Sequence, residues 1–121
     1  MINFYGPEYI DHIGLFLLFG HFLADYPLQG DFLAKAKDPY NPIPGVPWYQ
    51  AMFAHCFIQA VFVLLFTGMY SLFIFEFMVH WITDMSKCKK MISYNVDQGI
   101  HIGCKVLYTL IFLFLSSELY K

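Results

Sequence analysis

The hydrophobic positions of the chain fall into four long stretches, the second and third of which follow each other directly. These stretches cover residues 10–26, 48–69, 70–85 and 100–115. Each is close to the ~20 residues with which an α-helix crosses a bilayer. The pattern therefore predicts an all-α, polytopic membrane protein with four transmembrane helices, at about residues 8–26, 48–69, 70–90 and 94–116. We expect them to form one four-helix domain, residues 1–121.

Polar residues recur at helical spacing inside these stretches. Glu76, His80, Asp84 and Lys87 follow one another at intervals of four, four and three, so they share one stripe of one helix. The other stretches carry similar sets, namely His21 and Asp25, His55 and Gln59, and Asp97 and His101. The remaining apolar residues are expected to serve as scaffolding for these stripes.

The connections between the stretches indicate a topology. Pro27 disrupts the first helix, and residues 28–37 keep apolar residues at helical spacing, which predicts a short interfacial helix after the first span. Residues 38–47 hold four prolines and a glycine and form a loop. Five of the seven lysines lie in or beside the first and third connections: Lys35, Lys37, Lys87, Lys89 and Lys90. That side should be cytoplasmic, with both termini away from the cytoplasm.

Composition excludes an ordinary soluble domain, because 59% of the residues are hydrophobic and 13% are charged. Residues 1–11 hold no basic residue and so lack the start of a cleavable signal peptide, and the first span should be retained. The three cysteines, Cys56, Cys88 and Cys104, cannot all pair with one another and are expected to be reduced. The net charge of -2 does not define a partner, and nucleic acid is not expected as one.

The polar side chains of the four helices should lie at one depth. Counting 1.5 Å per residue from the connections puts the histidines and aspartates in one layer, with Glu76 and Lys105 level with each other one turn deeper. A charge at the bilayer centre costs about 2.5–3.5 kcal/mol, so we expect these two to pair. Three aspartates then leave a charge of -3. One divalent ion would reduce it to -1, and two with a bridging hydroxide to 0.

The charge count and the residue types predict a site for one or two divalent metal ions. Zinc is favoured, and manganese and iron stay open, because imidazole and carboxylate ligands suit all three. The expected ligands are His21, Asp25, His55, His80, Asp84, Asp97 and His101. A lone histidine such as His55 more often bonds a neighbouring helix. Four helices aligned at one depth favour a metal or proton-handling site.

Three motifs resemble those of a known family: His21-x-x-x-Asp25-x-x-x-Gln29, His80-x-x-x-Asp84-x-x-Lys87 and Asp97-Gln98-x-x-His101. They are similar to a bacterial and phage family of small integral membrane proteins of unknown function. The resemblance implies the bacterial inner (cytoplasmic) membrane and the same seven residues as the functional set. A looser similarity to inner-membrane metal-dependent hydrolases suggests an activity.

The first functional hypothesis is a membrane-embedded, metal-dependent hydrolase that acts on an amphiphilic phosphate or ester at the cytoplasmic leaflet. Metal-bound water is its nucleophile, with Glu76 and Lys87 as the catalytic residues beside the metal. The alternatives are a small membrane transporter or proton/ion pathway that uses the His/Asp cluster, and a non-enzymatic phage or bacterial membrane regulator. The expected partners are the lipid bilayer and an anionic lipid or amphiphilic substrate, and a homo-oligomer stays open.

Overall fold

The computed structural model describes residues 7–119, and every regular element in that range is a helix. The elements are α1 (Pro7–Asp11), α2 (Ile13–Asp25), α3 (Gly30–Ala36), α4 (Trp48–Thr67), α5 (Tyr70–Cys88) and α6 (Tyr94–Leu119). The all-α prediction is confirmed. Parts of the expected N-terminal segment and of the 1–121 domain, residues 1–6 and 120–121, lie outside the described residues.

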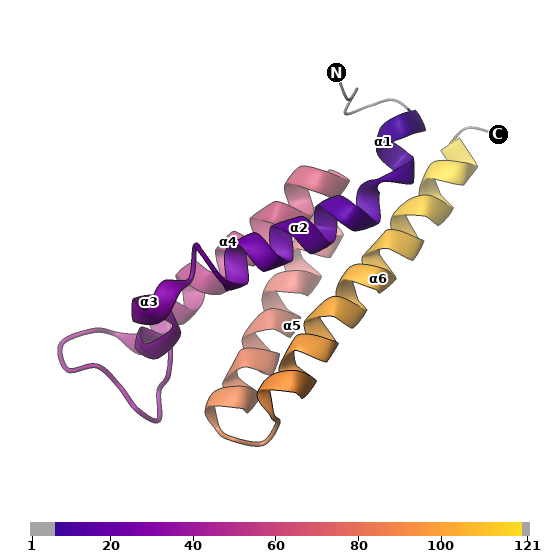
Figure 1. The fold of residues 1–121 in the computed structure, drawn as a ribbon. Helices are drawn as coiled ribbons and strands as arrows, with labels where there is room; N and C mark the ends of the chain where they lie inside the picture. Colours follow the sequence, from indigo (N-terminus) through magenta and orange to yellow (C-terminus); the bar gives the residue numbers. More distant parts are fainter. Residues whose placement is uncertain (1–6, 120–121) are drawn as a thin grey trace.

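The four long helices form a bundle in which α2 packs against α4 and α6, and α5 packs against the same two helices (Figure 1). A tight turn joins α4 to α5. Gly68 closes α4 in the left-handed conformation, with φ 67°, and its N–H donates to the Leu64 carbonyl. In Figure 1 α1 and the last turns of α6 lie at one end of the bundle, and α3 and the proline-rich loop lie at the other.

The first helix differs from the sequence prediction, because it is interrupted at His12. The His12 N–H donates to the Tyr9 carbonyl at 3.1 Å, which tightens the turn between α1 and α2. The interfacial helix is also shorter than expected. It begins at Gly30, whose φ of 58° favours glycine, and the chain between Asp25 and Gly30 makes a turn around Pro27.

Large apolar side chains cover much of the outer surface. Eight of them are exposed by 60–72%: Leu15, Phe32, Leu65, Tyr70, Ile82, Met91, Leu110 and Phe114. Two helices, Trp48–Thr67 and Tyr94–Glu118, are long and apolar enough to cross a membrane by length and composition. α2 has 13 residues, and α5 carries three charged residues. Length and composition thus support two of the four expected spans.

The interior is divided along the bundle axis. An apolar cluster occupies the end near α1 and includes Ile13, Leu17, Val63, Leu72 and Tyr108. Buried polar side chains follow it toward α3. Gly20 lies opposite α4 where the two helices approach closely, because a Cβ there would stand 2.9 Å from Phe66 and 3.0 Å from the Cβ of Phe62.

We expect Gly20→Val to lower the free energy of unfolding by about 1–3 kcal/mol, because the new side chain must push α2 away from α4. Gly103→Val is the matched control, since nothing lies within 4 Å of a Cβ on Gly103. Unfolding of both variants in mixed detergent micelles measures the difference. Equal stability of the two variants would show that α2 and α4 do not pack this closely.

Candidate metal centre

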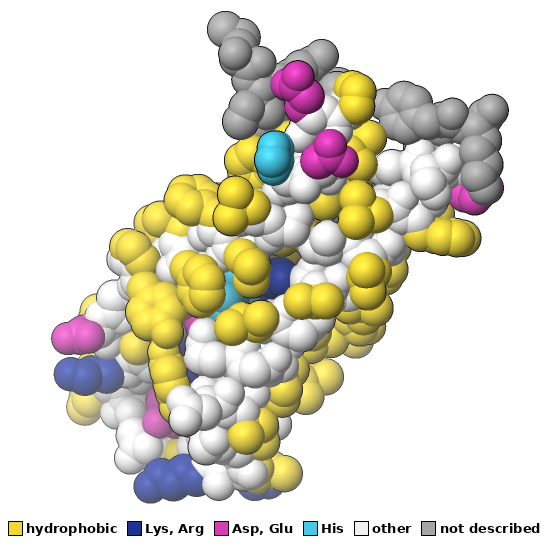
Figure 2. Space-filling model, turned by 45° about the vertical axis from the view of Figure 1, so that its right-hand side comes forward, with side chains coloured by type: hydrophobic (Ala, Val, Ile, Leu, Met, Phe, Trp, Pro, Cys, Tyr) yellow, Lys and Arg dark blue, Asp and Glu magenta, His cyan; other side chains and the backbone are white. Residues whose placement is uncertain are grey.

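The seven predicted ligand residues come together inside the bundle, from α2, α4, α5 and α6. Asp25 is 8% exposed and the other six are at most 1% exposed: His21, His55, His80, Asp84, Asp97 and His101. In Figure 2 histidine and lysine atoms are visible in a hollow among hydrophobic side chains in the middle of the face shown. Buried imidazole and carboxylate groups need partners, and their contacts define the centre.

Glu76 closes the centre on the side of the apolar cluster. Its Oε1 accepts a hydrogen bond from Lys105 Nζ at 2.6 Å, and its Oε2 accepts one from the Tyr108 hydroxyl at 2.7 Å. The expected Glu76–Lys105 ion pair is therefore present. Both oxygens are occupied, so these contacts favour a positioning role for Glu76 over direct contact with a substrate. Tyr108 was not expected from the sequence.

Glu76 also sets the orientation of His80, whose Nδ1 lies 3.2 Å from Glu76 Oε1. A carboxylate only accepts hydrogen bonds, so we assign the proton of His80 to Nδ1. Nε2 of His80 then presents a lone pair to the centre. Metal-binding histidines commonly have this carboxylate contact on the outer nitrogen, because it fixes both the tautomer and the ring.

Ligand atoms of His80, His55 and Asp25 converge on one point inside the bundle. His55 Nε2 lies 3.0 Å from His80 Nε2 and 3.2 Å from Asp25 Oδ1. The ligand atoms of Asp25, His55 and His80 are all within 4.8 Å of one another, so they could hold one metal ion. Two imidazoles and a carboxylate form a ligand set that zinc accepts.

Asp84 connects this group to a second one. Its Oδ2 lies 3.3 Å from His55 Nε2, and its Oδ1 lies 3.2 Å from His101 Nε2. Asp84, Asp97 and His101 form a second possible ligand set, and Glu76, His80 and His101 form a third that overlaps both. Oδ1 of Asp97 is buried without a hydrogen-bond donor in the described part of the chain. Asp84 is thus shared between two halves of the centre.

His21 lies at the edge of the centre. Its Nε2 is 3.1 Å from Gln98 Oε1 and 3.8 Å from Asp25 Oδ2, and it belongs to none of the ligand sets found among residues 7–119. Gln98 in turn donates from Nε2 to Asp25 Oδ2 at 2.6 Å. His21 is therefore placed to orient Gln98, and through it Asp25.

Two glutamines and a lysine contact the centre although they were not among the predicted ligands. Gln59 and Gln98 donate to the two oxygens of Asp25. Both could have been found, since Gln59 follows His55 by four and Gln98 adjoins Asp97. Lys37, which the sequence suggested only as a topology marker, is 2% exposed and donates to Asp84 Oδ2. No local pattern signals this contact, because it depends on how α3 folds back on the bundle.

The lysines change the expected charge of the centre. Lys87 Nζ lies 3.0 Å from Asp97 Oδ2 and 3.9 Å from Asp84 Oδ1. Lys37, Lys87 and Lys105 together face Asp25, Glu76, Asp84 and Asp97. Four carboxylates against three ammonium groups leave -1 with neutral histidines. The expected charge of -3 was too large because Lys37 and Lys87 were not counted in it.

Residues 13–120 match the model of a family described as a protein of unknown function, DUF3307. The chain belongs to this family. The matched range of the DUF3307 chain contains all the residues of the centre, and the expected resemblance to a family of unknown function is confirmed. No curated protein and no solved structure matches the chain, and a similarity to hydrolases is not shown.

We expect Glu76→Gln to lower the free energy of unfolding by about 3 kcal/mol or more, because Lys105 becomes a buried cation without a carboxylate. Asp31→Asn is the control, since Asp31 is exposed on α3. Denaturation in mixed micelles measures both, and Glu76→Gln combined with Lys105→Met should recover part of the loss. If Glu76→Gln were as stable as Asp31→Asn, the stabilising role of the Glu76–Lys105 ion pair would be refuted.

Proposed function

We propose that this chain is a four-span membrane protein that binds a divalent metal ion and hydrolyses a phosphate or ester bond of an amphiphilic substrate at the cytoplasmic leaflet. The observation that carries the proposal is the pair of Nε2 atoms of His55 and His80, 3.0 Å apart and beside the Asp25 carboxylate. His80 Nε2 carries no proton when Nδ1 donates to Glu76, so this pair together with a carboxylate is well suited to a cation.

The distribution of charge around α5 supports a membrane-spanning role for it. Glu76 and Asp84 are each 1% exposed, whereas Ile74, Met78 and Ile82 are 57–62% exposed. α5 therefore presents an apolar outer face although its sequence contains charges. α2 does the same, with Leu15 and Phe19 directed outward. Helices with apolar outer faces and polar groups toward the bundle interior suit a bilayer.

The roles of the residues follow from their contacts. A bound divalent ion would supply a Lewis acid and an activated water. Asp25, His55 and His80 would hold it, with Asp84 beside them, and Glu76 would keep His80 in the orientation that binding needs. Zinc is the favoured ion, and manganese or iron also fits the ligands. One ion changes the charge of the buried set from -1 to +1. A second would raise it to +3, which favours one.

The two ends of the centre differ, and this difference favours a pocket over a pore. Toward α1 the centre ends at Glu76, Lys105 and Tyr108, followed by the apolar cluster. Toward α3 it ends at Lys87, whose side chain is 24% exposed. Lys87 is therefore placed to orient an anionic group that arrives from the α3 end.

Proton transfer is the second candidate, and one observation favours it. Asp97, His101, Asp84 and His55 follow one another at 3.2–3.4 Å. Such a series of imidazole and carboxylate groups can relay protons. The apolar cluster toward α1 is the reason to rank this candidate below the hydrolase.

We expect the protein to purify with about one divalent ion per chain, since a metal neutralises the buried carboxylates that the lysines leave unpaired. His80→Ala and Asp84→Ala should each lose the ion. His12→Ala should keep it, because His12 is exposed outside the centre. Elemental analysis of purified protein gives the stoichiometry. Protein that is folded, free of metal and insensitive to chelator would rule out the metal centre.

The topology has a separate test. A cysteine introduced by Asn41→Cys, in a chain with its own three cysteines replaced, should react with an impermeant maleimide only after the cells are opened, because the lysine-rich side faces the cytoplasm. A cysteine introduced by Glu8→Cys at the opposite end should react in intact cells. Labelling of position 41 in intact cells would reverse the proposed orientation.

A further inference from the structure

Lys37 is the buried cation of the centre that comes from outside the four long helices. It follows the last residue of α3, and its side chain is 2% exposed. Nζ donates to Asp84 Oδ2 and also to Gln29 Oε1. Gln29 is held in turn by its Nε2, which donates to the Asp25 carbonyl. The ammonium group is thus positioned by Asp84 of α5 and by Gln29, which is itself bonded to the end of α2.

Lys37 and Lys87 approach Asp84 from its two oxygens. Lys37 contacts Oδ2, and Lys87 Nζ lies 3.9 Å from Oδ1. Lys105, by contrast, is engaged by Glu76 at the far end of the centre. Two ammonium groups therefore flank the shared carboxylate at the end that is partly exposed. A metal ion held by Asp25, His55 and His80 would lie beside Asp84, whose Oδ2 is 3.3 Å from His55 Nε2, and would compete for its negative charge. Lys37 would then be available to an anion, and Lys87, which also pairs with Asp97 Oδ2 at 3.0 Å, would lose one of its two acidic partners.

The charge of the metal-loaded centre fits one negative charge. The described carboxylates and lysines of the centre sum to -1, and one divalent ion brings the sum to +1. A monoanionic group would bring it to zero. A dianion would leave -1, and a buried excess charge of either sign is unfavourable.

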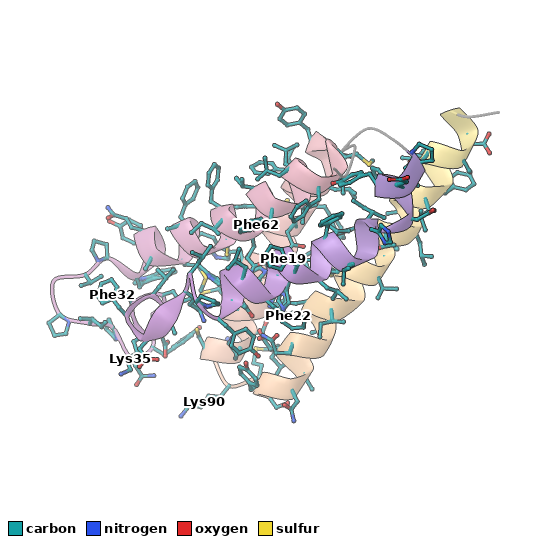
Figure 3. The ribbon with its side chains drawn as sticks, turned by 45° about the horizontal axis from the view of Figure 1, so that its top comes forward. Phe19, Phe22, Phe32, Lys35, Phe62 and Lys90 are labelled. Carbon is teal, nitrogen blue, oxygen red and sulfur yellow. The ribbon has the colours of Figure 1, made fainter. Side chains whose placement is uncertain are left out.

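The helix that carries Lys37 indicates where such an anion would come from. α3 exposes Phe32 by 64%, and the preceding turn exposes Leu28 by 48%. Figure 3 labels Phe32 and Lys35 on α3, and Lys90 on the turn between α5 and α6. Exposed apolar and basic side chains on one short helix are typical of the headgroup region of a membrane. The monoanions common in that region are phosphodiesters.

We propose that Lys37 and Lys87 bind a phosphodiester monoanion beside the metal ion. This inference rests on the proposed function and gives its substrate class. The two non-bridging oxygens of a phosphodiester share its single negative charge and can contact two ammonium groups at once, and charge-assisted contacts of this kind are strong. The phosphodiester can belong to a lipid headgroup or to a soluble compound.

The test is the effect of an anion on metal affinity, because binding of two ligands at coupled sites is reciprocal. Zinc affinity of the full chain in detergent is measured by competition with a chelating dye. Dimethyl phosphate should strengthen zinc binding about tenfold in the wild type, and acetate should have a much smaller effect. Short-chain phosphatidylglycerol acting as well as dimethyl phosphate indicates a lipid headgroup. An effect of dimethyl phosphate alone indicates a soluble phosphodiester.

The variants distinguish a specific effect of Lys37 on anion binding from a general effect of surface charge. Lys37→Gln should bind zinc but lose the effect of dimethyl phosphate, whereas Lys35→Gln, at an exposed position of the same helix, should keep it. If Lys37→Gln does not fold, Lys37→Arg keeps the charge and should keep the effect. Zinc binding without any anion effect, an equal effect of acetate, or a full effect in Lys37→Gln overturns the phosphodiester site and leaves the metal centre standing. A wild type that binds none of zinc, manganese and iron overturns both.

Discussion

The buried Glu76 carboxylate organises the interior of this bundle. A charge surrounded by apolar helices is stable only when it is paired and its oxygens accept hydrogen bonds, and Glu76 meets both conditions through Lys105 and Tyr108. The same carboxylate fixes the orientation of His80, whose unprotonated Nε2 is directed at His55. One ion pair thus separates the apolar half of the core from the polar half and orients the first ligand of the centre.

The other buried carboxylates of the polar core are stabilised by polar and charged side chains from several helices. Asp25 accepts hydrogen bonds from two glutamine side chains, while Asp84 and Asp97 face lysines from α3 and α5. Each carboxylate has a different set of partners, so the centre is asymmetric. Asp25 has no lysine among its described contacts, and it lies beside the two imidazole nitrogens that converge. This asymmetry is the reason to place the metal ion near Asp25, His55 and His80.

The short helix α3 joins the outer surface of the bundle to the centre. Its outer side exposes Phe32 and Lys35, while Lys37 at its end enters the buried network. A helix of seven residues has little stability of its own, so its place depends on such contacts. Because Lys37 is held by an ion pair, another anion can replace Asp84 as its partner. Binding of an anion at the centre would therefore act on α3.

The sequence by itself determined the helical class, the positions of α4 and α5 to within about two residues, and the polar stripes, because hydrophobic runs and a spacing of four are local properties of a helix. It also determined the Glu76–Lys105 pair, which follows from matching depths. Only the tertiary structure decided the interruption at His12, the edge position of His21 and the burial of Lys37. These depend on how α2 turns into α3 and how α3 folds back on the bundle. Sequence spacing carries no information about contacts of that kind between separate elements, and for this reason the charge of the centre could not be counted correctly before the fold was known.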